Sequence, residues 1–209
     1  MPASWDADRI EAGRADCDRR LRGLNVRLRR EDPIKEGSCG LPAPVRLQSF
    51  EFDDAPDATF APAPILSCGM VEALRRWLDA VVQPQAKARL DATVIVIATA
   101  SDYNCRSRFG PGGEKLSQHA FANALDISAF ITAKGERIDI LESWDAGDDR
   151  ALFLHAIHDG ACRIFGTTLG PPANDSHKDH FHLDMTDRRE RLCDFTQEQL
   201  LSRATGNAK

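Results

Sequence analysis

The stretch LDISAFI (Leu125–Ile131) decides the fold class of this chain. Apolar residues at every second position alternate with Asp126, Ser128 and Phe130, and a period of two is the side-chain period of a β-strand. Leu125 and Asp126 therefore point to opposite faces of the expected strand. The stretch predicts a strand that carries a carboxylate on the face away from Leu125.

Strand patterns also occur on both sides of this stretch. Lys134-Gly135 favours a turn into a second strand around Ile138, and Thr93–Thr99 (TVIVIAT) is a β-branched run typical of a buried strand. His180–Met185 alternates strictly, with two histidines and an aspartate on one face and apolar residues on the other. We expect an α+β fold with a small antiparallel sheet flanked by helices.

Helical patterns lie between these strands. Apolar residues over Met70–Val81 recur at helical spacing, and Pro84 is expected to end that helix. A second helix is predicted over Asp148–Asp159, with Gly160 as its C-cap.

The chain is expected to form one domain with extensions at both ends. Its 209 residues, 42% of them hydrophobic, suit a single buried core. We assign residues 1–16 to an N-terminal extension, 17–195 to the domain and 196–209 to a C-terminal tail. Residues 1–38 are interpreted as a charged helix followed by a loop, and residues 50–64 as a connector.

Composition and charge narrow the classes of function. The formal net charge is −5, so neither a nucleic acid nor an anionic membrane is indicated as a partner. No apolar run approaches the roughly 20 residues that cross a bilayer, so no transmembrane segment is expected. The N-terminus also lacks the apolar stretch of a secretory signal. Either a signal has been removed, or export uses another route, or the protein stays inside the cell.

Six cysteines are dispersed along the chain, without a C-x-x-C pair. An even, dispersed set favours disulfides and therefore an oxidising compartment such as the periplasm. The alternative is six buried free thiols in a cytosolic protein. Six cysteines allow 15 pairings, so the sequence alone assigns none. They are Cys17, Cys39, Cys68, Cys105, Cys162 and Cys193.

Two segments carry histidine and aspartate in patterns that favour metal binding. In the first, SQHAFANALD, His119 precedes Asp126 by seven residues, and the second, HKDHFHLD, contains His177, His180 and His182. Imidazole nitrogens and carboxylate oxygens are ligands that zinc accepts, and three protein ligands leave a fourth position for water. Bound zinc polarises a carbonyl and makes water acidic, which is the chemistry of peptide hydrolysis.

Other residues of these types have simpler interpretations. His155 and His158 lie three apart on a predicted helix and are interpreted as surface or core residues. Asp184 shares the face of His180 and His182, so it is either a hydrogen-bond partner of a ligand or a plain carboxylate at the end of a strand.

Five blocks of the sequence together resemble the extensin-like C-terminal family of bacterial proteins. They are CGLPAPVRL (39–47), SDYNCRSR (101–108), KLSQHAFANALDIS (115–128), DGACRIFGTTLGP (159–171) and HKDHFHLDM (177–185). The resemblance runs from about Cys17 to Cys193 and covers all six cysteines, which strengthens the expectation of disulfides. This family is similar to the LAS-type zinc peptidases, which include D-alanyl-D-alanine carboxypeptidases and dipeptidases, penicillin-insensitive murein endopeptidases and the lysostaphin type.

The resemblance implies a role for each conspicuous residue. His119, Asp126 and His182 match the three zinc ligands of the His-x6-Asp and His-x-His motifs. His180 matches an active-site histidine that is not a ligand and acts as a base or stabilises the tetrahedral intermediate. His177 matches a further active-site histidine of the murein endopeptidases.

The general base stays open among three residues. Asp179 precedes His182 by three positions, where the dipeptidases carry a glutamate base. We rank His180 first, Asp179 second and His177 third.

Three other positions bear on the site. Arg106 is similar in place to an arginine that meets substrate or the developing oxyanion in some relatives, and Arg108 is its rival. Ala122 stands where many superfamily members have glycine. Since alanine tolerates a positive φ poorly, the local turn is expected to differ.

The function implied by the resemblance is a zinc-dependent peptidase in the periplasm or outside the cell. It would hydrolyse peptidoglycan stem peptides or cross-links, as a D,D- or L,D-type endopeptidase or carboxypeptidase. The alternative is a catalytically silent, zinc-containing module that binds the cell wall. If the chain is a secreted toxin, an immunity protein is the expected partner. A structural wall protein is not indicated, because the 11 prolines are scattered rather than in tracts.

Overall fold

The structure is a computed structural model that describes residues 4–108 and 115–194. The expected tail of residues 196–209 lies outside these ranges. Helix α1 (Ala7–Leu21) runs across the position at which we expected the domain to begin. The division into extension, domain and tail stays a prediction.

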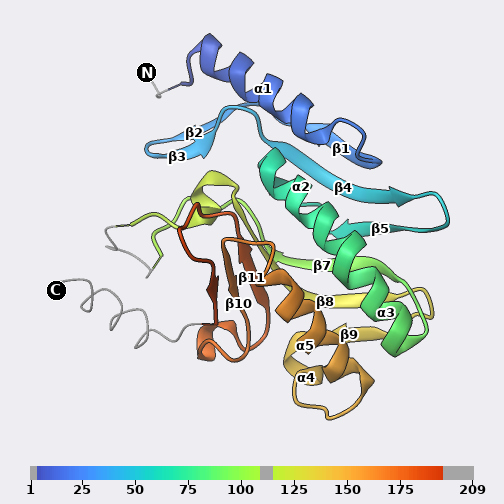
Figure 1. The fold of residues 1–209 in the computed structure, drawn as a ribbon. Helices are drawn as coiled ribbons and strands as arrows, with labels where there is room; N and C mark the ends of the chain where they lie inside the picture. Colours follow the sequence, from blue (N-terminus) through green and yellow to red (C-terminus); the bar gives the residue numbers. More distant parts are fainter. Residues whose placement is uncertain (1–3, 109–114, 195–209) are drawn as a thin grey trace.

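A large mixed sheet is the framework of the fold (Figure 1). Its strand order is β1-β4-β5-β7-β8-β11-β10-β12, with β6 on β4 and β9 on β8. The pairs β5–β7 and β10–β12 are parallel and the remaining pairs are antiparallel. The strands are β1 (Val26–Arg30), β4 (Val45–Phe52), β5 (Ala55–Ala61), β6 (Ile65–Leu66), β7 (Val94–Ser101), β8 (Ala124–Thr132), β9 (Arg137–Asp139), β10 (Thr167–Leu169), β11 (Phe181–Asp184) and β12 (Leu192–Cys193).

The α+β class is confirmed, but the sheet is larger than predicted and is not purely antiparallel. The strands expected at 93–99, 125–131 and 180–185 are present as β7, β8 and β11. The supposed connector at 50–64 forms strand β5 and the end of β4, and part of the supposed loop before residue 38 forms β1. Strand β1 buries no residue and β5 buries only Ala58 and Phe60, so pairing with neighbours decides the conformation of these two strands more than local pattern does.

A second, small sheet is a hairpin of β2 (Ile34–Glu36) and β3 (Cys39–Leu41). Its first strand, β2, lies in the segment before residue 38 that we interpreted as loop. Gly40 in β3 is paired with Lys35, and a Cβ at Gly40 would lie 2.0 Å from the carbonyl oxygen of Ile34. Only glycine fits there, because its φ is also +111°.

The α-helices that follow β6 in the chain lie on one side of the large sheet (Figure 1). They are α2 (Cys68–Trp77), a π-helical turn η1 (Leu78–Val82), α3 (Gln83–Leu90), α4 (Ile140–Ser143) and α5 (Asp149–Ala161). Trp77 anchors this layer: its ring packs edge-on against Phe130 of β8 and Phe165, and its Nε1 donates to the Ile157 carbonyl at 2.9 Å.

Pro84 does not end the helix that starts in α2. The chain passes through the π-helical turn, in which the Gln83 amide donates to the Leu78 carbonyl, and Pro84 lies in the first turn of α3. A proline is tolerated in a first helical turn, and the wider π turn before it leaves room for the ring.

Gly160 is not the C-cap of α5, which ends at Ala161 with Cys162 as the cap. A Cβ at Gly160 would lie 2.3 Å from Cγ1 of Val81 in the π-helical turn. Glycine is therefore present because two helical segments approach closely, and not because the helix must turn.

Three disulfides join distant parts of the chain, which confirms the expectation from the cysteine pattern. They are Cys17–Cys68, Cys39–Cys105 and Cys162–Cys193. Such bonds are typical of proteins in an oxidising compartment. No helix in the described ranges is long and apolar enough to cross a membrane.

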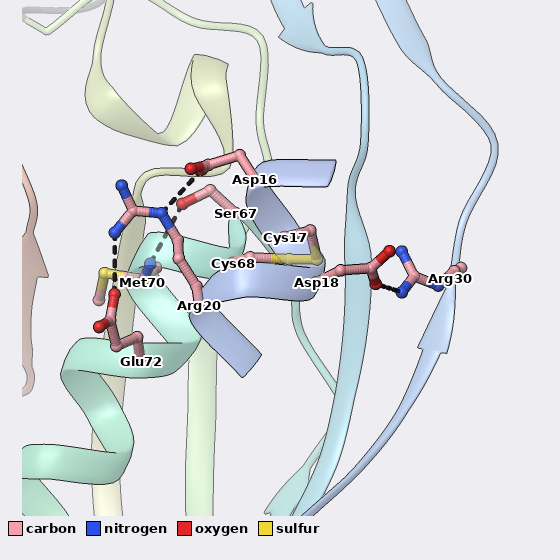
Figure 2. Close-up of a disulfide and its surroundings, with 9 residues drawn as sticks. All are labelled: Asp16, Cys17, Asp18, Arg20, Arg30, Ser67, Cys68, Met70 and Glu72. Carbon is pink, nitrogen blue, oxygen red and sulfur yellow. Dashed lines mark hydrogen bonds and ion pairs between the residues drawn. A yellow bond between two sulfur atoms is a disulfide. The ribbon is translucent and has the colours of Figure 1, made fainter. Parts of the chain in front are cut away.

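The bond Cys17–Cys68 attaches α1 to the first turn of α2 (Figure 2). Beside it, Arg20 of α1 pairs with Asp16 on its own helix and with Glu72 of α2, both within 2.8 Å. Covalent and ionic contacts therefore hold α1 against the rest of the fold.

Candidate metal centre

Three elements bring His119, Asp126 and His182 together. Asp126 lies on β8 and His182 on β11, and the two residues are direct partners in the antiparallel register. Their neighbours Leu125 and Leu183 belong to the buried core, so the alternation places Asp126 and His182 on the opposite face of the sheet. His119 comes from the 3-10 helix η2 (Gln118–Phe121), which directly precedes β8.

The turn after η2 takes the left-handed conformation even though it contains alanine. Ala122 has φ 50° and ψ 29°, and its amide donates to the carbonyls of Gln118 and His119. The expectation that alanine would change the local turn is therefore wrong. The Ala122 side chain is fully buried, so surrounding packing holds a backbone conformation that costs an alanine about 1–2 kcal/mol.

The three candidate ligand atoms form a nearly equilateral triangle. His119 Nε2 lies 3.2 Å from His182 Nδ1 and 3.2 Å from Asp126 Oδ1, and the last two atoms are 2.9 Å apart. In a tetrahedral zinc site with bonds of roughly 2.0–2.1 Å, two ligand atoms are about 3.3 Å apart. The donor types and spacing therefore fit a zinc ion with one coordination position left for another ligand.

Hydrogen bonds behind both imidazoles orient the rings. His119 Nδ1 lies 2.6 Å from the backbone carbonyl oxygen of Asp102, to which it donates, so Nε2 faces the cluster. His182 Nε2 donates in the same way to Asp184 Oδ2 at 3.2 Å, and the second oxygen of Asp184 accepts from the Thr186 amide. Such partners select the tautomer that presents a lone pair to a metal.

The electrostatics of the cluster favour a charged carboxylate. Burial acts to raise the pKa of Asp126, but His119 and His182, which can donate to this carboxylate when their rings are protonated, outweigh burial and hold that pKa well below its usual value. Burial acts to lower the pKa of His182, but Asp126 and Asp184 outweigh it and raise this pKa to about 9. The two buried carboxylates of the cluster thus favour positive charge beside them, which a proton on His182 supplies in the absence of a metal and a bound cation would supply in its place.

His180 is the base candidate that points toward this cluster. Its Nε2 lies 3.9 Å from Asp126 Oδ1, while its Nδ1 is 2.8 Å from Asp179 Oδ1. The Asp179 carboxylate is therefore engaged behind His180, and its side chain is 58% exposed. The hydrogen bond from His180 lowers the pKa of Asp179, so this carboxyl is charged at neutral pH.

His177 lies beside the other two histidines of its segment. Its ring centroid is 5.3 Å from that of His180 and 6.1 Å from that of His182. Its Nδ1 donates to Asn174 Oδ1 at 2.9 Å. Burial and the neighbouring histidines lower the pKa of His177 to about 4, so its ring is neutral at pH 7.

Comparison with known proteins identifies the family of this chain. A sequence profile described as the extensin-like protein C-terminus matches residues 15–194. The chain belongs to this family. No curated protein and no solved structure gives a significant match. The extensin-like assignment is thus established at the level of the family, while a relation to LAS-type zinc peptidases stays a prediction.

The two arginines considered from the sequence lie in the loop after β7 of this extensin-like domain. The Arg106 carbonyl accepts from the Ser117 amide and the Arg108 amide donates to the Lys115 carbonyl, while both side chains are exposed. Within residues 4–108 and 115–194, no ion pair joins either guanidinium to a carboxylate of the cluster. A catalytic role for Arg106 or Arg108 stays a prediction.

Two other features of the extensin-like domain do not form a comparable centre. His158 lies near Cys162 and Cys193, but these cysteines form a disulfide and so offer no thiolate. A groove of about 560 Å³ lies beside the Cys17–Cys68 bond, and among its lining residues, Arg20 already pairs with Asp16 and Glu72 (Figure 2). The three candidate ligands are not part of its lining.

Sequence reasoning did not find the groups that orient these side chains. The partner of His119 is a backbone carbonyl, which every residue type has, so no pattern could single out Asp102. Asn174 is separated from His177 by only two residues, but asparagine there is also an ordinary N-cap, and it caps η3 (Asp175–His177). Asp184 was open between two roles, and its carboxylate is a hydrogen-bond partner of His182.

Proposed function

We propose that this extensin-like domain is a zinc-dependent peptidase that hydrolyses peptidoglycan stem peptides or cross-links, as an endopeptidase or a carboxypeptidase of D,D or L,D type. The observation that supports this proposal most directly is the triangle of His119 Nε2, Asp126 Oδ1 and His182 Nδ1, with edges of 2.9–3.2 Å. Two imidazoles, which give up their proton on the facing nitrogen when a metal binds, and one carboxylate are a donor set that catalytic zinc sites use.

A structural role for this cluster explains it less well. Buried polar groups usually find hydrogen-bond partners, and a buried carboxylate can take them from backbone amides or hydroxyl groups without any imidazole. Here two imidazole nitrogens converge on one carboxylate oxygen, and each ring is held from behind by a separate acceptor. Convergence of three ligand atoms on one small volume favours a cation.

Bound zinc would supply a Lewis acid that polarises the scissile carbonyl and makes a water acidic. His119, Asp126 and His182 would hold the ion. His180 Nε2 has its lone pair on the side of the cluster, because its Nδ1–H donates to Asp179. His180 would take a proton from the attacking water and give it to the leaving amine, with Asp179 orienting the ring and stabilising the imidazolium.

This geometry favours His180 over its two rivals as general base. The Asp179 carboxylate contacts Nδ1 of His180, the nitrogen that faces away from the cluster. The His177 ring lies beside the His180 ring, with their centroids 5.3 Å apart. His177, neutral at pH 7 and hydrogen-bonded to Asn174, would add no charge beside His180 and His182. Periplasmic or extracellular location is part of the same proposal and is consistent with the three disulfides.

The experiment measures zinc content and digestion of purified peptidoglycan on the same samples of wild type, His182→Ala and His155→Ala. His155 is the matched control, because it is a histidine on α5 whose ring contacts Trp144 away from the cluster. We expect one equivalent of zinc and new muropeptides from wild type and His155→Ala, and neither from His182→Ala.

Two other outcomes change the conclusion. Zinc at one equivalent without any new muropeptide would favour a catalytically silent module that binds the cell wall, and sedimentation with peptidoglycan sacculi would then test that alternative. Wild-type protein that contains no zinc, when purified without chelator and dialysed against zinc, would refute the proposal.

A further inference from the structure

We propose that the Cys39–Cys105 disulfide positions the ligand His119, so that this bond, unlike Cys17–Cys68, sets the zinc affinity of the centre. The inference rests on the proposed function. It concerns a covalent bond that contributes no atom to the site and acts through the loop that holds one ligand.

The loop that follows β7 holds His119 by its backbone. The Asp102 carbonyl accepts from His119 Nδ1 at 2.6 Å, and the Asn104 amide donates to the His119 carbonyl at 3.2 Å. Two residues on, the Arg106 carbonyl accepts from the Ser117 amide at 2.9 Å. Hydrogen bonds therefore join the loop to His119 itself and to the segment that leads into η2.

The same loop is fastened to the small hairpin β2–β3. Cys105 is bonded to Cys39 in β3, and the Tyr103 hydroxyl lies 3.2 Å from Glu36 Oε1 at the end of β2. Asp102, whose carbonyl accepts from His119, is also held by its side chain, because the carboxylate accepts from the Ile65 amide at 2.6 Å. The stretch of loop between these anchors is short.

The hairpin also packs against the helical turn that carries His119, since β3 contacts η2. One end of the bond, Cys39, is buried at 2% exposure, whereas Cys105 and its neighbours Asn104 and Arg106 are exposed. An exposed loop with few side-chain contacts has little packing to keep it in place. The disulfide supplies that restraint from a buried point.

Loss of the bond should therefore act on His119 before it acts on the fold. If the loop moves, the Asp102 carbonyl no longer selects the Nδ1–H tautomer, and a larger share of molecules carries the proton on Nε2, where the metal must bind. Loss of a hydrogen-bond partner behind a histidine ligand typically lowers metal affinity 10- to 100-fold.

The test compares Cys39→Ser/Cys105→Ser with Cys17→Ser/Cys68→Ser. The two bonds close loops of similar length, with sequence separations of 66 and 51, so their removal should loosen the unfolded chain to a similar degree. Zinc dissociation constants are measured by competition with a chromophoric chelator. We expect affinity to fall roughly tenfold in the first variant and by less than about twofold in the control.

A second readout reports the cause directly. Long-range ¹H–¹⁵N NMR of metal-free protein identifies which nitrogen of His119 carries the proton. We expect Nδ1–H in wild type and in the control, and a mixture of tautomers in Cys39→Ser/Cys105→Ser. An unchanged tautomer together with unchanged affinity, or equal loss of affinity in both variants, would overturn the inference.

Mild reduction and alkylation of the folded wild type decide the question if the double variant does not fold, because Cys105 is exposed whereas Cys17 and Cys68 are buried. We expect opening of the Cys39–Cys105 bond alone, verified by peptide mapping, to lower zinc affinity roughly tenfold. Unchanged affinity after this bond is opened would overturn the inference. If the wild type binds no zinc, the proposed function fails, and the tautomer of His119 still decides whether the disulfide positions this ring.

Discussion

At the scale of single residues, two aspartates at the cluster have different tasks. Asp126 shares one oxygen with both histidines, whereas Asp184 contacts only the far nitrogen of His182 and is itself fixed by the Thr186 amide. A carboxylate in the second position orients the imidazole and raises its basicity, which strengthens the bond from imidazole to metal.

We predict that Asp184→Asn lowers zinc affinity by roughly 10- to 100-fold, because an amide is a weaker acceptor for His182 Nε2–H. Competition with a chromophoric chelator measures the affinity. Asp187→Asn is the matched control, since Asp187 is exposed and lies just beyond the strand. Equal affinities of the two variants would show that Asp184 does not act on the metal.

Tyr103 is the single tyrosine of the chain, so its ionisation can be followed without interference from another phenol. Burial, reinforced by Glu36, raises the pKa of Tyr103 to about 12. We predict an ultraviolet absorbance titration of the phenol with its midpoint near pH 12 in native protein and near the ordinary tyrosine pKa of 10.0 in denaturant.

This shift also has a consequence for stability. Between pH 10 and 12, Tyr103 keeps its phenol proton in the folded state but has lost it in the unfolded state. The contribution of this proton to the free energy of unfolding is therefore complete below pH 10 and is lost as the pH rises toward 12. Denaturation at several alkaline pH values should show this decline in wild type and a smaller decline in Tyr103→Phe. Identical declines would mean that Tyr103 is not the responsible group.

At the scale of elements, the contact between α5 and the π-helical turn depends on a glycine. Alanine normally stabilises a helix interior by about 0.5–1 kcal/mol relative to glycine. At Gly160, however, the added Cβ would meet Val81 at 2.3 Å, and forcing a methyl group into a packed interface costs typically 1–3 kcal/mol. The net effect of such a change should therefore be destabilising.

We predict that Gly160→Ala lowers the free energy of unfolding by roughly 1–2 kcal/mol, as measured by denaturant titration. Val81→Ala in the same chain should recover part of the loss, because it removes the two methyl groups that clash. Gly69→Ala in α2 serves as control, since its Cβ would meet nothing closer than 3.8 Å. A Gly160→Ala variant as stable as the wild type would show that the helices separate at little cost.

At the scale of the whole molecule, three disulfides join segments that are 31 to 66 residues apart. The bond Cys162–Cys193 connects the end of α5 to β12, the last described strand of the large sheet. Since β12 has only two residues, its own hydrogen bonds hold it weakly. The covalent link therefore carries much of the attachment of this edge.

We predict that Cys162→Ser/Cys193→Ser lowers the free energy of unfolding by about 2–4 kcal/mol, with β12 the first region to exchange its amides. Denaturant titration and hydrogen exchange measure the two effects. Peptide mapping without reduction should recover the three pairs seen here. Any other pairing would contradict the arrangement of α5 and β12.

Much of the site could be predicted before any tertiary structure. The period of two placed Asp126 on one strand, and His180, His182 and Asp184 on one face of another, because alternation is a property of each strand by itself. His119, Asp126 and His182 were grouped by their resemblance to a ligand motif. The fold brings one nitrogen or oxygen atom of each side chain within 3.2 Å of the other two. The cysteine count, which is an even number spread along the chain, also indicated disulfides.

The tertiary structure alone decided what depends on contacts between distant segments. The sheet proved large and mixed because β1, β4 and β5 are stabilised by pairing, Pro84 was accommodated by a π-helical turn, and Gly160 was required by Val81. Contacts between distant segments also decided which cysteines pair. They decided as well which ring nitrogen of each histidine faces the candidate metal centre. The physical reason is that periodicity reports which face of a segment is buried, whereas pairing, close approach and tautomer depend on partners that lie elsewhere in the chain.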